Sequence, residues 1–145
     1  MSAPLRVVFD TNVALALEVF ADPRLLALRE RWDRDELTAI ADDQTLAEFD
    51  RVLRYPELRM NEVAAVEASV RYRGRCTIIP PGSAIASTVP ICRDPDDQKF
   101  LLLAHRAGAD WLLTRDKALL ALRKAVRFGI ALPEALLTGP PRGSA

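Results

Sequence analysis

The sequence predicts an α/β protein in which helices cover both faces of a mostly parallel sheet. Five short apolar segments alternate with segments of helical periodicity, and short connections join them. The 145 residues are half hydrophobic, which is enough for one sizeable core. We therefore expect a single three-layer α/β/α domain over residues 1–138 and a flexible tail over 139–145.

The expected strands are short apolar runs, and turn signals separate them from their neighbours. They occupy residues 5–9, 37–42, 76–80, 110–114 and 128–132. The stretch 80–90 contains Pro, Gly and Ser and is expected to be a loop.

The expected helices begin at capping residues and end at breaks in the apolar period. They cover residues 11–20, 22–32, 43–53, 61–74, 94–108 and 116–125. Thr11 or Asn12 is expected to cap the first helix, and Asp22, Asn61 and Asp94 cap later ones. The fourth and fifth helices are expected to end at Gly74 and Gly108.

Composition excludes several classes of protein. The 20 basic and 20 acidic side chains balance, which argues against a purely electrostatic coat for nucleic acid. No apolar run approaches the ~18 residues of a membrane span, and no targeting segment precedes the first strand. The two cysteines lack metal-ligand spacing and suit a reducing cytosol, so we expect a cytoplasmic protein without a membrane partner.

Two aspartates mark one edge of the predicted sheet. Asp10 ends the first apolar strand, "VVFD", although a charged carboxylate is costly to bury. Asp116 follows the strand 110–114. Ligands of such folds bind outside the carboxyl ends of the strands, so both aspartates emerge where a site is expected.

Helical phase adds two further acids. Counted at about 100° per residue, Asp97 falls on the apolar arc of the fifth helix, while Lys99 and His105 fall on the opposite side. Asp94 is better explained as the cap of that helix. Glu48 lies at the margin of the apolar stripe of the third helix.

The set of four acids predicts a metal site. Carboxylates brought together repel one another unless a cation neutralises them, and hard oxygen ligands suit Mg²⁺ or Mn²⁺. Two such ions about 3.5–4 Å apart can activate water and stabilise the leaving oxygen of a phosphodiester. Thr11, Asn12 and Thr114 are expected to orient the ligands through hydrogen bonds, and Arg93 and Arg115 flank the acidic motifs as candidate phosphate contacts.

Three segments, "VVFDTN", "LAEFDRVL" and "DPDDQKFLLLAHRAGADWLLTRDKALL", resemble the PIN-domain ribonuclease family over residues 5–132. The resemblance is to the PIN-type toxins of prokaryotic toxin–antitoxin pairs. It implies Mg²⁺- or Mn²⁺-dependent RNA cleavage, a cognate antitoxin and frequent homodimers. The family's acidic quartet corresponds to Asp10, Glu48, Asp97 and Asp116, with Thr114 and Asn12 in support and Asp94 as a possible further ligand.

Alternative functions differ in the residues that they require. An Asp-based phosphatase of the haloacid-dehalogenase type needs a second Asp two residues after Asp10, where this chain has Asn12. A receiver domain needs an acceptor Asp on a middle strand, and "CTIIP" has none. His105 is the only histidine and lies on a polar face, which disfavours a Ser-His-Asp hydrolase. A catalytically silent metal-binding module stays open, and the sequence does not specify which RNA is cleaved.

Overall fold

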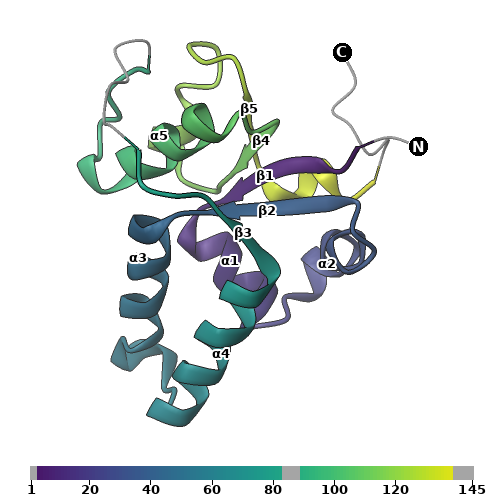
Figure 1. Ribbon diagram of the computed structural model, residues 1–145, viewed down its shortest axis with the longest axis vertical. Helices are drawn as coiled ribbons and strands as arrows, with labels where there is room; N and C mark the ends of the chain where they lie inside the picture. Colours follow the sequence, from purple (N-terminus) through teal and green to yellow (C-terminus); the bar gives the residue numbers. More distant parts are fainter. Residues whose placement is uncertain (1–2, 83–88, 139–145) are drawn as a thin grey trace.

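The computed structural model describes residues 3–82 and 89–138, and in that part of the chain five parallel strands form one sheet (Figure 1). The strand order is β3-β2-β1-β4-β5. The strands are β1 (Leu5–Phe9), β2 (Leu37–Ala41), β3 (Cys76–Ile78), β4 (Trp111–Leu113) and β5 (Gly129–Ala131). The predicted three-layer class with a mostly parallel sheet is confirmed. Part of the expected loop 80–90 and the whole expected tail 139–145 lie outside the described residues.

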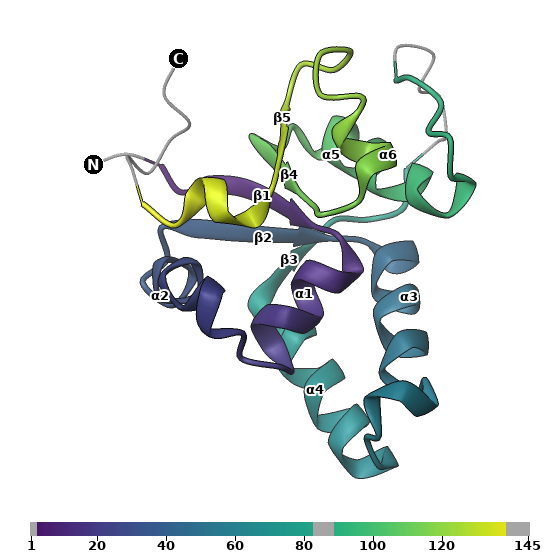
Figure 2. The ribbon, with the colours of Figure 1, turned by 180° about the vertical axis from the view of Figure 1, so that it is seen from behind.

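Helices cover both faces of the sheet (Figure 2). One side carries α1 (Thr11–Glu18), α2 (Leu26–Asp33), α3 (Asp43–Leu53) and α4 (Glu62–Arg75). The other side carries α5 (Gln98–Ala107) and α6 (Lys117–Leu120). Short 3₁₀ turns span Pro23–Leu25, Pro56–Leu58, Pro95–Asp97 and Pro133–Leu136. No helix in residues 3–82 and 89–138 is both long and apolar enough to cross a membrane.

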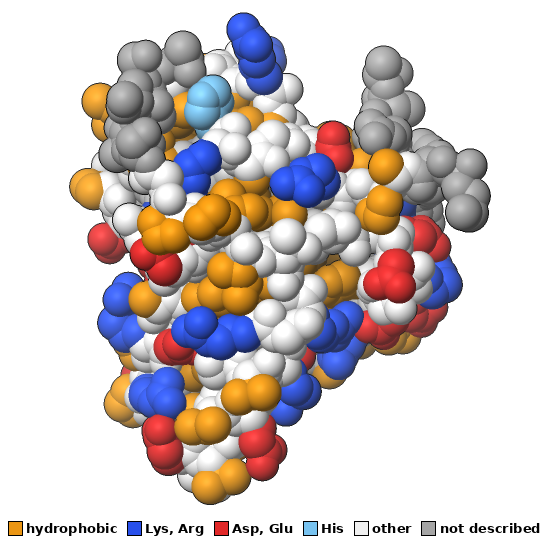
Figure 3. All heavy atoms as spheres, viewed as in Figure 1, with side chains coloured by type: hydrophobic (Ala, Val, Ile, Leu, Met, Phe, Trp, Pro, Cys, Tyr) orange, Lys and Arg blue, Asp and Glu red, His pale blue; other side chains and the backbone are white. Residues whose placement is uncertain are grey.

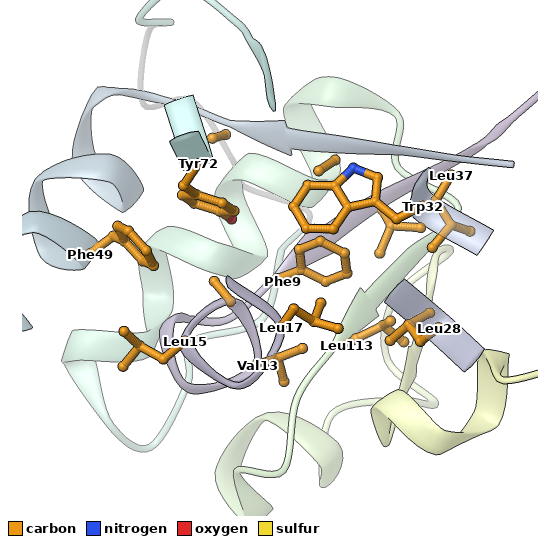
Figure 4. Packing of buried hydrophobic residues seen from close by; sticks show 14 of the residues in the cluster. Phe9, Val13, Leu15, Leu17, Leu28, Trp32, Leu37, Phe49, Tyr72 and Leu113 are labelled. Atoms are coloured by element: carbon orange, nitrogen blue, oxygen red, sulfur yellow. The ribbon is translucent and has the colours of Figure 1, made fainter. Parts of the chain in front are cut away.

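The central strand β1 is buried on both faces, which explains its continuous apolar sequence. Leu5, Val7 and Phe9 pack toward α1–α4, and the Phe9 ring meets Trp32 edge-on at 5.3 Å (Figure 4). Val8 points the other way, into the cluster formed with α5 and α6. Packing on both faces makes the end of this strand a rigid platform for the residue that follows it.

Several element boundaries differ from the sequence prediction. The cap of α1 is Asp10, not Thr11 or Asn12. Helix α4 continues to Arg75, because Gly74 does not adopt the left-handed conformation that ends a helix; Gly108 does, and it ends α5 as predicted. Helix α6 is much shorter than 116–125, because the chain after Leu120 continues in turns that lead back to β5.

Two predicted helices begin with a 3₁₀ turn instead of an α-helical one. Asp22 and Asp94 do cap these segments, each accepting a backbone hydrogen bond two residues on. The regular helices α2 and α5 start only at Leu26 and Gln98. A 3₁₀ turn advances about 120° per residue, so side chains before Gln98 point in directions that an α-helical count does not give.

The strand order reverses direction at β1. From β1 the chain builds outward through β2 and β3, and it then returns to place β4 and β5 on the other side of β1. Ligands bind at such a switch point, outside the carboxyl ends of the two diverging strands. Phe9 pairs with Leu113, and the Asp10 amide donates to the Leu113 carbonyl at 3.1 Å. Asp10 and Thr114 therefore leave adjacent strands at the same edge, as the sequence predicts.

Candidate metal centre

A hollow of about 100 Å³ lies at the switch point. Its lining contains all four acids singled out in the sequence, and it comprises Asp10, Thr11, Asn12, Glu48, Val52, Asp97, Phe100 and Asp116. A larger hollow of about 350 Å³, lined by residues such as His105 and Arg127, contains no carboxylate. Chemistry, not size, therefore distinguishes the candidate site.

Asp10 joins the two strand ends. One carboxylate oxygen accepts the Val13 amide at 2.9 Å and so caps α1, and the other accepts the hydroxyl of Thr114. Thr114 is fully buried, and its hydroxyl oxygen accepts the Asp116 amide at 2.9 Å. Asp10 itself is only 6% exposed. The predicted supporting role of Thr114 thus has a geometric basis, because this one hydroxyl contacts Asp10 and the backbone of Asp116.

Asp94, Asp97 and Asp116 form the tightest group of carboxylates. One oxygen from each lies within 4.8 Å of the other two. Asp94 and Asp116 are fixed by capping bonds to the amides of Asp96 at 3.0 Å and Ala118 at 2.7 Å. Oδ2 of Asp97 is buried and has no hydrogen-bond partner among the residues that the structure describes. Three converging carboxylates with an unpaired buried oxygen fit a hard divalent cation.

The electrostatics of the site follow from this crowding. Burial, followed by the negative charge of Asp116 and a hydrogen bond with it, raises the pKa of Asp97 to about 7. The pKa of Asp10 is also raised, chiefly by burial, although the hydrogen bonds from Thr114 and Val13 oppose the shift. The negative charges of Asp116 and Glu48 add to it. A bound cation would favour the charged form of every one of these groups.

Glu48 also lines the hollow, and it is already paired. Its Oε1 lies 2.6 Å from the ammonium of Lys99 and 3.7 Å from the guanidinium of Arg51. Its Oε2 accepts a hydrogen bond from the hydroxyl of Thr11, a residue that the sequence predicts to orient the ligands. Glu48 therefore differs from the three clustered aspartates, which have no cation partner in the described part of the chain.

The ion pair of Lys99 with Glu48 is a contact near the site that the sequence does not predict. An α-helical count from Asp97 put Lys99 on the polar side, opposite the acids. Asp97 belongs to the 3₁₀ turn Pro95–Asp97 and not to α5, so the count begins in the wrong geometry. The sequence does contain a signal of this distinct first turn, because Pro95 directly follows the cap Asp94.

The two candidate phosphate-binding arginines lie outside the hollow. Arg93 is exposed, and Arg115 forms an ion pair with Glu134 at 2.5 Å. Neither contributes to the lining of the hollow. His105 is exposed, in agreement with its predicted position on a polar helical face.

An all-parallel sheet with clustered carboxylates at its switch point defines an α/β protein whose candidate site suits a divalent cation. The family model described as "PIN domain" matches residues 6–118, and the chain therefore belongs to the PIN-domain family. Membership implies a nuclease-type function, and the family typically uses divalent metals.

Comparison with solved structures supports the fold. The chain is similar to PAE2754 from Pyrobaculum aerophilum, with a TM-score of 0.53 and 19% identity over 92% of this chain and 93% of that one. No curated protein matches the sequence.

Proposed function

We propose that the chain is a Mg²⁺- or Mn²⁺-dependent endoribonuclease, the activity that the resemblance to PIN-type toxins implies. The observation that carries the proposal is the convergence of Asp94, Asp97 and Asp116 beside the buried Asp10, at the sheet edge where ligands bind. Divalent metal supplies charge stabilisation and an activated water for phosphodiester hydrolysis.

The chain's own residues have distinct roles in this proposal. The three clustered aspartates hold the cation. Asp10 contributes negative charge to the same hollow, and the Val13 amide and the Thr114 hydroxyl keep its carboxylate in one orientation. Asn12 lines the hollow as a polar group available to water or substrate. Fixed ligands of this kind spare the site much of the reorganisation that ionic chemistry otherwise requires.

The purified chain should cleave a mixed pool of RNA in Mn²⁺ and leave it intact in EDTA. The measurement is the size distribution of the RNA on a denaturing gel, with hydrolysis of a phosphomonoester followed in parallel. Mn²⁺ binding without cleavage of any RNA would favour the catalytically silent module. Release of phosphate from the monoester alone would favour the Asp-based phosphatase.

Arg93 and Arg115 are proposed to contact RNA phosphates beside the hollow. Replacing both with alanine should weaken RNA binding and flatten its dependence on salt, since each lost phosphate contact lowers the slope by about 0.7 for single strands. Affinity is measured by fluorescence anisotropy in EDTA at several salt concentrations. Arg34→Ala is the matched control, because Arg34 also pairs with a glutamate, Glu36 at 2.9 Å, but lies at the end of α2 and does not line the hollow. Unchanged salt dependence in the double variant would contradict the assignment.

A toxin role and a cognate antitoxin are part of the proposal and rest on the family resemblance. They predict that the chain arrests growth of a host cell, and that co-expression of a protein encoded beside it relieves the arrest. Growth arrest that is lost when the acids of the hollow are replaced would tie the toxicity to cleavage.

The homodimer is proposed to form through α4. Val63, Val66 and Val70 are 66%, 44% and 64% exposed and lie at helical spacing on one face (Figure 3 shows hydrophobic side chains over this helix). The acidic residues of α4, Glu62 and Glu67, lie in its first half and its arginines in its second half, so two antiparallel copies would bring opposite charges together.

Val66→Asp should therefore shift the chain from dimer to monomer in light scattering coupled to size exclusion. Leu132→Asp is the matched control, because Leu132 is 46% exposed and lies outside α4. A wild-type monomer, or a dimer that Val66→Asp leaves intact, would reject α4 as the interface.

A further inference from the structure

Glu48 is distinguished from the other carboxylates at the hollow by its cation. In residues 3–82 and 89–138, no ion pair involves Asp10, Asp94, Asp97 or Asp116, whereas Glu48 pairs with Lys99 at 2.6 Å. The second oxygen of Glu48 accepts the Thr11 hydroxyl. Both oxygens of Glu48 are therefore engaged by the chain itself.

Lys99 is held in place more firmly than a surface lysine. Its side chain is 16% exposed and that of Glu48 is 14% exposed, so solvent screens the pair less than it screens an exposed one. The Lys99 ammonium also donates to the backbone carbonyl of Asp96 and lies 5.4 Å from the centre of the Phe100 ring. The carbonyl, the ring and the carboxylate together fix the ammonium beside Glu48, which lines the hollow.

The cluster of three aspartates has the reverse balance of charge, with negative groups and no cation beside them in the described residues. Asp94, Asp97 and Asp116 bring three carboxylates within 4.8 Å, and Oδ2 of Asp97 is buried without a partner in the described residues. A single divalent ion would balance most of this charge. The site thus has one group of acids that lacks a cation partner in the described residues and one acid, Glu48, that already has one.

We propose that the ammonium of Lys99 takes the place of a second metal ion beside Glu48, so that the chain binds one divalent cation, at Asp94, Asp97 and Asp116. The inference rests on the proposed metal-dependent function and revises the two-ion site predicted from the sequence. A second ion in a two-metal site lies about 3.5–4 Å from the first. An ion bound by Glu48 would have to displace the Lys99 ammonium or face its positive charge at close range.

The number of Mn²⁺ ions bound per chain tests the proposal directly. Isothermal titration should give one ion for the wild type and two for Lys99→Met, which keeps an unbranched apolar stem over Phe100 and removes the charge. Electron paramagnetic resonance should show isolated Mn²⁺ in the wild type and magnetically coupled Mn²⁺ in the variant. Lys99→Arg restores a cation and should return the count to one, and Lys124→Met, at an exposed lysine away from the hollow, should not change it.

The outcomes separate this inference from the proposed function. Two ions in the wild type, or one ion in a folded Lys99→Met chain, would overturn the role of Lys99 and leave the metal-dependent function standing. A wild type that binds no Mn²⁺ would overturn both. Circular dichroism checks that each variant is folded, and if Lys99→Met is not, the wild-type count and the Lys99→Arg count decide.

Discussion

Replacing Asp10 with asparagine should abolish RNA cleavage while leaving the chain folded. Asparagine has nearly the shape of aspartate but brings no negative charge and little affinity for a metal ion. Losing this charge beside the metal should reduce the cleavage rate by at least about 100-fold, on the order of 3 kcal/mol of transition-state stabilisation. The rate is measured under single-turnover conditions in saturating Mn²⁺.

The stability of Asp10→Asn should stay within about 1 kcal/mol of the wild type, because two effects oppose one another. The amide oxygen can keep the bond from the Val13 amide, so α1 retains its cap. The amide nitrogen then faces the Thr114 hydroxyl, which already accepts the Asp116 amide, and that hydroxyl must find another acceptor for its proton. Against this loss, a buried carboxylate with a raised pKa no longer has to be ionised in the fold.

Asp42 offers a matched control, since it is a buried aspartate that follows β2 as Asp10 follows β1. It caps α3 through the Thr45 amide at 2.9 Å and is 4% exposed, but it does not line the hollow. Asp42 also pairs with Arg106 at 3.1 Å, so Asp42→Asn should lose more stability than Asp10→Asn and still cleave RNA. Full activity in a folded Asp10→Asn chain would mean that Asp10 is only a helix cap.

The location of the candidate site could be predicted because it depends on strand order and not on side-chain detail. An apolar strand that ends in Asp10, and a second strand followed by Asp116, lie at the same edge of any parallel sheet. The structure places β1 and β4 side by side and brings both aspartates to one hollow. The expected cap of α1, Thr11 or Asn12, is wrong, because Asp10 both caps this helix and lines the hollow.

Lys99 could not be placed from the sequence, because its direction depends on where the regular helix begins. The turn Pro95–Asp97 is 3₁₀ and α5 starts at Gln98, and this change of geometry lies inside one continuous helical pattern. The partner Glu48 lies on α3, and only tertiary packing determines that these two helices meet. Contacts between distant elements of this kind are not encoded in periodicity.

Replacing Asp97 with asparagine should abolish cleavage and greatly weaken Mn²⁺ binding, while stabilising the metal-free chain at neutral pH. Asp97 is one of three converging carboxylates, so the substitution removes a ligand and leaves Asp94 and Asp116 without the geometry that a hard cation requires. We expect a loss of cleavage of at least about 100-fold. Asp96 lies on the same turn but is exposed and outside the cluster, so Asp96→Asn should retain both RNA cleavage and Mn²⁺ binding.

The pH dependence of stability identifies the same carboxyl group without any assay of activity. The pKa of Asp97 is about 7 in the folded chain and 3.8 in the reference state, so between these values the folded chain binds more protons than the unfolded one. In EDTA, the contribution of Asp97 to stability is therefore present below about pH 4 and is lost as the pH rises toward 7. Asp97→Asn cannot ionise, so its free energy of unfolding relative to wild type should increase over this range and level off above it. Urea titrations of the two chains at matched pH give this difference, and groups that titrate equally in both cancel.

Added Mn²⁺ should stabilise the wild type and not the variant, because the ion binds the ionised carboxylates of the folded chain. A difference that is flat from pH 4 to 7 would show that neither burial nor the neighbouring aspartates raise the pKa of Asp97 in the folded chain, and the case for a cation at this carboxylate would be lost.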